Sequence, residues 1–463
     1  MMGSKKAFQA ALFYDFSLED HVPSDHLLRS VDRFVDLDYI RKYLAAFYSD
    51  IGRPSIDPEL MIRMLLVGYI MGIRSERRLC EDVHLNLAYR WFCRLDLGDA
   101  VPDHSTFSKN RHGRFRESDL FRHVFENVVT RCIEEGLVSG QRFAVDASLI
   151  EADTNRQNST SKEEWKPEAI NPAEAPRAVC EYLAKLDDAA FGAATTVQPK
   201  FTSHSDPASQ WTAARKGPAY FAYSANYMID TDNAVILDVE ATRSVRQAEV
   251  GAARTMIDRI ADKFNLHPER LIADTAYGSA PMLDWLVQQR GIAPHIPVID
   301  KSGRKDGTFE RADFIYDADD DSYTCPGGKK LRQFRRAYKT PRSGADKDNT
   351  MRYRAKKTDC DTCGLKSVCT PKEPQRKVTR SIYEPSRDIA RNITKTIDYA
   401  ISCKLRKKVE MLFAHLKRIL KLDRLRLRGP CGAKDEFHLA ATAQNLRKLA
   451  KLITAPKTPR KTA

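Results

Sequence analysis

Two aspartates stand where they could hold divalent metal ions. Asp146 and Asp274 each follow a short apolar run typical of a strand, FAVD and LIAD. A carboxylate at the end of a buried strand can keep its charge if it meets a cation, and magnesium is usually bound by few carboxylates together with water and phosphate oxygens. For either aspartate alone, the alternative is that it only caps the turn that follows.

A third acid lies in a late helical segment, CKLRKKVEMLFAHLKR. Arg406 precedes Glu410 by four residues and Lys417 follows it by seven, so the three fall within roughly 40° of one another on a helix. Apolar residues flank this charged stripe and place it at the edge of a packed interface: Val409, Leu412, Phe413 and Leu416. A carboxylate there can reach a metal while the cations hold phosphates. Simple salt-bridge pairing on a surface helix is the alternative.

Four of the ten cysteines, Cys325, Cys360, Cys363 and Cys369, lie close together in a basic stretch. The C-x-x-C bite at 360–363 suits tetrahedral zinc, and four thiolates could clip a loop-rich segment with little apolar content. The spacing is irregular, so reduced thiols without metal remain an equal alternative. The other six are scattered and predict buried thiols rather than a disulfide framework.

Basic residues are concentrated in two segments. The chain has 76 Lys and Arg against 62 Asp and Glu, a net charge of +14. Residues 326–380 hold 17 basic against five acidic side chains, and residues 404–428 hold ten against two. Such surface suits a polyanion, because each neutralised phosphate releases counterions. A solvated basic face is the plainer interpretation.

No segment has the roughly 20 apolar residues that a membrane span needs. The first residues, MMGSKKAFQAALFYDF, soon meet acidic side chains and show no small-residue cleavage site. We therefore expect a protein that works in the cytoplasm without a membrane partner.

The first part of the chain, residues 17–135, has a helical pattern. Asp57, followed by Pro58, predicts a helix start, and a second helix over 75–93 is indicated by apolar residues four apart: Leu79, Val83, Leu87 and Trp91. Asp103 can cap a third, polar helix that includes Arg111. Short helices of this kind suit a helix-turn-helix reader of DNA with Arg111 as a contact, and a plain helical bundle fits equally well.

From about residue 140 the pattern changes to strands mixed with helices, which predicts an α/β core. Strands are expected at 141–150, 221–230, 234–243 and 270–278, and helices at 176–190, 249–264, 280–291, 393–420 and 436–452. The predicted organisation is a helical DNA-binding domain over 1–135, a core in two parts over 136–300 and 393–455, a basic cysteine-containing insertion over 301–392, and a disordered basic tail over 456–463.

These motifs together resemble the DDE transposases of bacterial insertion sequences. The resemblance rests on strand–Asp146, on Asp274-x-x-Tyr-Gly, and on the helix pattern Arg-x3-Glu-x6-Lys, and it spans about residues 17–452 through further segments: PSIDPELMIRMLLVGYIMG, PDHSTFSKNR, PHIPV, CPGGKKL, CDTCGLKSVC and NLRKL. The family pattern has a tyrosine three residues before the arginine, and this chain has Cys403 there.

The resemblance implies an RNase H-like fold with an N-terminal all-α domain. It assigns Asp146, Asp274 and Glu410 as catalytic ligands of two Mg2+ ions, for which Mn2+ can substitute, with Arg406 and Lys417 on DNA. Its chemistry is cleavage at the ends of an insertion sequence followed by strand transfer, on double-stranded DNA that carries the terminal repeats and the target. A homo-oligomer on DNA is expected because two ends must meet.

Three smaller expectations concern residues near these motifs. Gly278 allows a tight turn after Asp274, and Tyr277 reaches either DNA or the core. Arg215 and Lys216 are either loop charges or phosphate contacts. Two other functions stay open beside transposition: a metal-dependent nuclease that cuts without joining, and a non-catalytic DNA-binding remnant.

Overall fold

The computed structural model describes residues 16–49, 51, 55–161, 163–186, 188, 199–213, 217–300, 303, 306–333, 344–346 and 349–453. Arg215, Lys216 and the expected tail at 456–463 lie outside the described residues. Among the described helices, none is both long and apolar enough to span a membrane.

The chain divides into two compact units. The first comprises Met1–Gly140, Val145–His267 and Lys407–Ala463, and the second comprises Gln141–Ala144 and Pro268–Arg406. Strand β1 (Arg142–Glu151) and helix α15 (Ile397–Arg418) each pass from one unit to the other.

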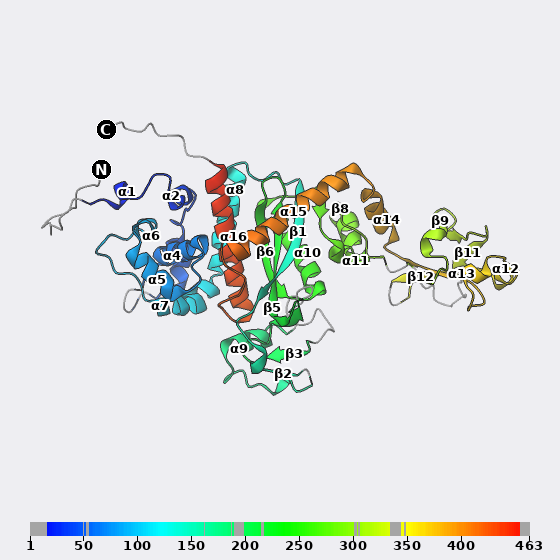
Figure 1. Cartoon of the computed structure of the whole chain (residues 1–463), viewed down its shortest axis with the longest axis horizontal. Coiled ribbons are helices and arrows are strands. Elements are labelled where there is room, and N and C mark those ends of the chain that lie inside the picture. Colours follow the sequence, from blue (N-terminus) through cyan, green and yellow to red (C-terminus); the bar gives the residue numbers. More distant parts are fainter. Residues whose placement is uncertain are drawn as a thin grey trace, which may run out of the picture. The chain divides into compact units, whose positions relative to one another are not determined.

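The N-terminal part of the first unit is helical, as the sequence predicted (blue to cyan in Figure 1). At α4, Asp57 Oδ1 accepts from the Glu59 N–H at 3.1 Å, and at α7, Asp103 Oδ1 accepts from the Ser105 N–H at 2.8 Å, so both predicted caps are confirmed. The elements are α1 (Leu18–His21), α2 (Leu27–Asp32), α3 (Ile40–Leu44), η1 (Ala45–Phe47), α4 (Pro58–Met71), α5 (Glu76–Leu85), α6 (Leu87–Phe92), α7 (His104–Asn110), the π-helical η2 (Arg111–Phe115) and α8 (Leu120–Glu134).

The predicted helix over 75–93 is wrong in its second half. The chain breaks at Asn86, whose side-chain oxygen accepts from the N–H groups two and three residues later, at 2.9 and 3.2 Å, and so caps a new helix. Leu79 and Val83 are buried as their spacing predicted, but after the break Arg90 and Phe92 are buried instead of Leu87 and Trp91. An asparagine that binds its own backbone ended the helix where apolar spacing alone would have continued it.

The sheet of the first unit is built round β5 (Ala219–Asp230). Residues 219–222 of β5 pair antiparallel with β4 (Gln210–Ala213), residues 223–230 pair antiparallel with β6 (Val235–Arg243), and β1 is its neighbour on the sheet. Helix α10 (Arg246–Phe264) packs on β5 and β6. The remaining elements are η3 (Arg156–Asn158), β2 (Ser159–Ser161), η4 (Pro167–Ala169), α9 (Arg177–Leu183) and β3 (Phe201–Ser203).

Helix α16 (Gly429–Leu452) runs through the interior of this unit and packs on α2, α4, α8, α9 and β6 (Figure 1). The predicted start at residue 436 is wrong, because the helix begins at Gly429 with Pro430 in its first turn, where a missing N–H costs nothing. The buried amide of Asn445 makes two hydrogen bonds with β6: its oxygen accepts from the Ile236 N–H at 3.0 Å, and its nitrogen donates to the Ile236 carbonyl at 2.8 Å. The amide therefore fastens α16 to the backbone of β6 at Ile236.

Glu436 is the most demanding group in α16, because its side chain is only 1% exposed. One carboxylate oxygen accepts from the backbone N–H groups of Arg426 and Leu427, each at 2.6 Å, and the other pairs with the buried guanidinium of Arg74. Three donors thus satisfy one buried charge. The arrangement ties the N-terminal helices and the segment after α15 to α16.

The sheet strands of the second unit are parallel where β1 contributes to it. Residues 142–144 pair with β7 (Arg270–Ile272), which pairs in turn with β8 (Ala293–His295). The predicted strand at 270–278 ends early, because η5 (Thr275–Tyr277) begins after Asp274. The helices are α11 (Ala280–Asp284), the π-helical η6 (Trp285–Gln289), α14 (Glu384–Ile393) and the first part of α15, which starts at Ile397 rather than at the predicted residue 393.

The predicted loop-rich insertion contains an ordered sheet instead, of strand order β13-β12-β11-β10-β9 with antiparallel neighbours. One of its faces covers a small core of Phe314, Tyr323, Leu331, Tyr353, Ala355 and Val378. Its elements are η7 (Arg311–Asp313), β9 (Ile315–Asp317), β10 (Ser322–Thr324), β11 (Lys330–Gln333), β12 (Thr350–Arg354), α12 (Lys357–Asp361), α13 (Lys366–Cys369) and β13 (Lys377–Ser381). A mixed α/β fold with a helical N-terminal region is therefore confirmed, while the predicted domain limits stay predictions.

The pH dependence of stability should depend on Asp206, which is fully buried. The Tyr223 hydroxyl donates to it at 2.5 Å and the Gly429 N–H at 3.1 Å, yet burial raises its pKa from 3.8 to about 6. The folded chain then keeps a proton that the unfolded chain releases between about pH 4 and 6, so stability falls as the pH rises through that window.

We predict that Asp206→Asn removes part of this fall, roughly 2 to 3 kcal/mol at most from a shift of about two pKa units. The measurement is the melting temperature from pH 4 to 7. Burial also raises the pKa of Asp435 to about 6, so some slope should remain. The exposed Glu134→Gln is the control and should keep the wild-type profile; a full slope in Asp206→Asn would contradict the assignment.

Candidate functional site

Asp146 lies within strand β1, not at its end. The strand continues to Glu151, close to its predicted end at residue 150, so only the expectation of a strand-end position for Asp146 is wrong. The side chain is half-buried, and Oδ1 accepts from the Ala147 N–H at 2.9 Å. Phe143, Ala144 and Val145 before it are fully buried. The carboxylate therefore stands where a buried strand first becomes accessible.

Asp274 follows β7 by two residues, as predicted for a strand end. Oδ1 accepts from the Ala276 N–H at 2.7 Å and caps η5, which is the turn-capping role weighed as its alternative. One oxygen of a carboxylate is enough for this cap, so the role does not exclude a cation on the other oxygen.

The turn after Asp274 has no space for a side chain at Gly278. A Cβ there would lie 1.9 Å from the Pro297 carbonyl oxygen, which belongs to the backbone. The glycine is required by this close approach, since its φ of −79° is ordinary. Tyr277 beside it is 2% exposed. Its ring therefore packs in the core, which is one of the two roles expected for it.

Helix α15 presents Glu410 at the edge of its packed face. Glu410 is exposed, and Arg406 and Lys417 are half-buried. Burial lowers the pKa of Lys417, and Asp423 opposes the shift. The apolar flank predicted from the sequence is buried as expected: Val409, Leu412, Phe413 and Leu416.

Two contacts fix this helix within the first unit. The ring of Phe413 stacks on Tyr227 of β5, with centroids 4.7 Å apart. Lys408 Nζ donates to the carbonyls of Thr231 and Asp232, where β5 ends, at 2.7 and 3.0 Å. Because β1 neighbours β5, the helix that carries Glu410 packs on the sheet that carries Asp146.

The beginning of α15 is anchored within the second unit. The Ser402 hydroxyl lies 2.8 Å from His295 Nδ1, on β8, and both side chains are buried. Burial and the nearby Arg270 lower the pKa of His295 to about 4, so the ring is neutral near pH 7. Tyr399 lies one turn before Cys403, the residue that replaces the tyrosine of the family pattern. Burial and a hydrogen bond with the Cys403 thiol raise the pKa of Tyr399 to about 12.

The N-terminal region corrects one predicted DNA contact. Arg111 is 3% exposed and forms an ion pair with Glu76. Burial alone would lower the pKa of its guanidinium, but the acidic neighbours, Glu76 above all, raise it. A side chain so enclosed holds α5 to the segment after α7 and offers nothing to DNA. The exposed polar residues of α7 are instead Ser105, Ser108 and Lys109. Their positions opposite the buried Phe107 were the signal that the sequence analysis missed.

The four clustered cysteines gather beside the core of the small sheet. Cys325, Cys360 and Cys369 pack against that core, and a Cβ at Gly327 would lie 3.7 Å from Cys325 Sγ and 3.5 Å from Cys363 Sγ. The Lys329 N–H donates to Cys325 Sγ at 3.3 Å. The thiols are half-buried and make no disulfide. Across the described residues, however, no three His, Cys, Asp or Glu side chains stand together as a metal site.

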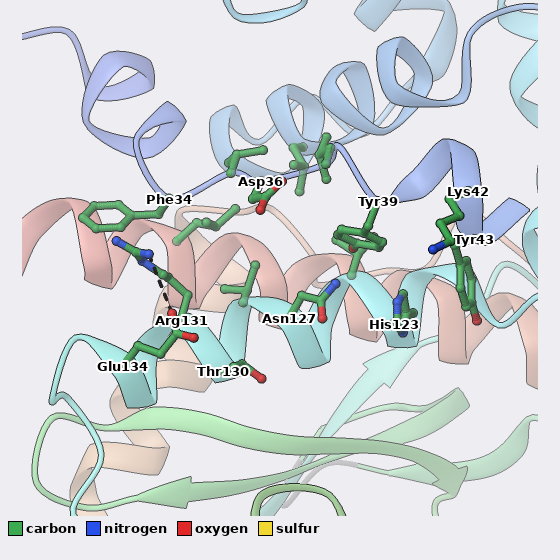
Figure 2. A pocket seen from close by; sticks show the side chains of 16 residues that line it. Phe34, Asp36, Tyr39, Lys42, Tyr43, His123, Asn127, Thr130, Arg131 and Glu134 are labelled. Atoms are coloured by element: carbon green, nitrogen blue, oxygen red, sulfur yellow. Dashed lines mark ion pairs between the residues drawn. The ribbon is translucent and has the colours of Figure 1, made fainter.

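A pocket of about 690 Å3 opens in the first unit between residues 34–43 and α8. Figure 2 shows its aromatic end, where Tyr43 stacks on His123 with ring centroids 4.1 Å apart and Tyr39 meets the same imidazole edge-on. An ion pair between Arg131 and Glu134, at 3.7 Å, lies at its other end. None of the three predicted catalytic acids lines this pocket.

Two family models match the chain. A transposase domain (DUF772) matches residues 16–113, and a transposase DDE domain matches residues 324–450. The chain belongs to the DDE transposases of the insertion-sequence type. No curated protein matches the sequence.

The two matched ranges cover different parts of the transposase. The first covers the helices from α1 to α7, and the second covers most of the small sheet, the four cysteines, the helix with Glu410 and most of α16. The cysteine-containing segment is thus largely part of the family's DDE domain and no foreign addition. Asp146 and Asp274 lie outside both ranges, so their roles rest on their positions on β1 and after β7.

We predict that Gly278→Ala destabilises the transposase by about 1 to 3 kcal/mol, since a backbone carbonyl must move to admit the methyl group. Thermal melting measures it. The matched control is Gly251→Ala, where a Cβ meets nothing within 4 Å in the middle of α10 and should stabilise by about 1 kcal/mol. Equal melting temperatures for the two variants would refute the steric argument.

Proposed function

We propose that this transposase cleaves DNA at the ends of an insertion sequence and joins the freed ends to target DNA, with divalent metal ions held by Asp146, Asp274 and Glu410. DDE transposases generally use such ions, and magnesium is the ion proposed here. The proposal also includes an RNase H-like core, supported by the central β1, its parallel partner β7 and the packing of α15 on the sheet.

The register of β1 and β7 is the observation that carries the proposal. Their parallel pairing matches Arg142 with Arg270 and Ala144 with Ile272. The same offset in sequence leads from Asp146 to Asp274. Each aspartate therefore lies two residues beyond the last matched pair of its strand, which supports a shared role for the two carboxylates.

The third acid is supported by the packing of α15. Phe413, which stacks on Tyr227 of β5, lies three residues after Glu410, so the two point about 60° apart on the helix. Glu410 is therefore directed along the edge of the interface with the sheet instead of away from it. Arg406 and Lys417 share its stripe and are half-buried, which restrains them beside it.

Three carboxylates are suitable donors for magnesium. This ion takes oxygen ligands and is commonly held by one or two protein carboxylates, with water and phosphate oxygens completing its octahedron. The acids therefore do not need to form a closed cluster before DNA arrives. When bound, such ions lower the pKa of an attacking water or 3′-hydroxyl and stabilise the leaving oxygen.

The chain's own side chains have separate tasks in this scheme. The three acids bring the negative charge that localises the cations, and Asp274 is held in position by its bond to the Ala276 N–H. Arg406 and Lys417 bind phosphates of the DNA, which orients the strand for in-line attack. Bringing two DNA ends together requires more than one such site, so we also propose a homo-oligomer on DNA.

We predict that Glu410→Gln abolishes cleavage of DNA carrying the element's terminal repeats, by at least about 100-fold, while binding of that DNA stays within about twofold. Cleavage in Mg2+ or Mn2+ and a gel-shift assay measure the two effects. Asp398→Asn, the same change on an exposed acid of α15, is the control and should remain active.

Two results would favour the other functions. Cleavage without strand transfer by the wild-type protein would make it a nuclease. Specific binding of the terminal repeats without any cleavage would make it a DNA-binding remnant. Loss of both binding and cleavage in Glu410→Gln would count against the role assigned to this carboxylate.

We propose, as a separate point, that the four clustered cysteines bind zinc. The support is their common location beside Gly327, the N–H donated to Cys325 Sγ, and the C-x-x-C bite. The placement of the thiols does not by itself form a metal site, so zinc would have to draw them closer.

We predict near one zinc per chain in metal analysis of the purified protein, lost in Cys363→Ser together with part of its thermal stability. Cys403→Ser, an exposed cysteine outside the cluster, should keep the metal and melt as the wild type does. A metal-free wild-type protein would leave the four as ordinary reduced thiols.

A further inference from the structure

The outer face of the small sheet carries a row of positive charges. The register matches Arg332 of β11 with Arg354 of β12, and Arg354 with Lys377 of β13. Residues directly opposite each other on antiparallel strands have their Cβ atoms about 5 Å apart on the same face. Three cations are therefore lined up across three adjacent strands.

The opposite face of these strands is the one that forms the core. Leu331, Tyr353 and Val378, which alternate with the row along the same strands, are at most 3% exposed. The side chains of Arg332 and Lys377 are 63% and 46% exposed. Since alternate residues of a strand point to opposite faces, Lys330 and Arg352 join the row on the outer face.

Such a row works against the stability of the sheet, because like charges placed directly opposite repel each other. The acids that form ion pairs with this row stand at its margins. Asp320 pairs with both Lys330 and Arg332, Asp346 pairs with Arg352 at 3.3 Å, and Glu373 pairs with Lys377 at 3.2 Å. Exposed ion pairs of this kind contribute little and exchange readily for other anions. An external polyanion would relieve the repulsion.

The outer face also indicates which polyanion fits. Among the described outward positions of β11, β12 and β13, the residues beside the cations are Thr350, Thr379 and Ser381. Hydroxyl groups donate to phosphates, whereas proteins that bind unpaired strands stack the bases on aromatic rings, and this face has no aromatic side chain at those positions. The face suits a phosphate backbone rather than exposed bases.

We propose that the outer face of β11–β13 binds the phosphate backbone of double-stranded DNA through Arg332, Arg354 and Lys377. This gives the transposase a DNA-binding surface in addition to the predicted catalytic acids and the exposed polar residues of α7. It rests on the proposed function only in taking DNA as the polyanion. The contacts carry no sequence information, so the surface holds DNA of any sequence.

The test is the salt dependence of duplex binding by the full-length chain. The triple variant Arg332→Gln, Arg354→Gln, Lys377→Gln is compared with wild type on a labelled duplex of arbitrary sequence, from about 50 to 200 mM salt. At roughly 0.9 per phosphate contact, the slope of log K against log salt should become shallower by about 2 to 3. The variant should melt no lower than wild type, because repulsion has been removed.

The matched control removes three exposed lysines from the same region but outside these strands: Lys356→Gln, Lys357→Gln, Lys372→Gln. It should keep the wild-type slope. An unchanged slope in the first variant, an equal change in both, or a loss confined to single-stranded DNA would each overturn the proposal. If the wild-type protein itself shows no salt-dependent duplex binding, the proposed function fails together with this surface. If the wild type binds and the triple variant behaves like it, the surface alone is refuted.

Discussion

The fold of the first unit depends on one buried charge, the carboxylate of Glu436. It is enclosed by Arg74 and by two backbone N–H groups of the segment before α16. A buried carboxylate without these donors would cost several kcal/mol, so α16 and the two segments that supply the donors must meet. Helix α16 is thereby fixed among the N-terminal helices and the sheet. Helix α15, which carries Glu410, packs on that sheet through Phe413. It is also bound to α16, because the Gln444 side chain donates to the Leu412 carbonyl.

The same need to satisfy buried groups distinguishes structural from functional charges. Arg111 and Arg74 lie in the interior and pair with acids, so their charges stabilise the fold. Glu410 is exposed at an interface edge, and Arg332 projects from a sheet face toward solvent. Basic residues within one transposase therefore serve different ends, and only their burial separates those that hold helices together from those available to DNA.

Local chemistry made much of this protein predictable. The caps at Asp57 and Asp103, the strands β1, β5 and β6, and the buried flank of α15 all follow from interactions within a few residues, which any nearby window of sequence contains. The family and the three acids were likewise recognisable from ordered motifs. The family is confirmed, whereas the convergence of the three acids stays a prediction, since no three such side chains form a metal site among the described residues.

What the sequence determined by itself was the type of element at most positions and the residues that qualify for catalysis. Only the tertiary structure decided that Arg111 and Tyr277 are buried and that the cysteine segment forms a sheet with a basic outer face. These outcomes depend on partners far along the chain. Whether a side chain faces solvent or core is settled by what packs against it, and spacing within one segment carries no record of that partner.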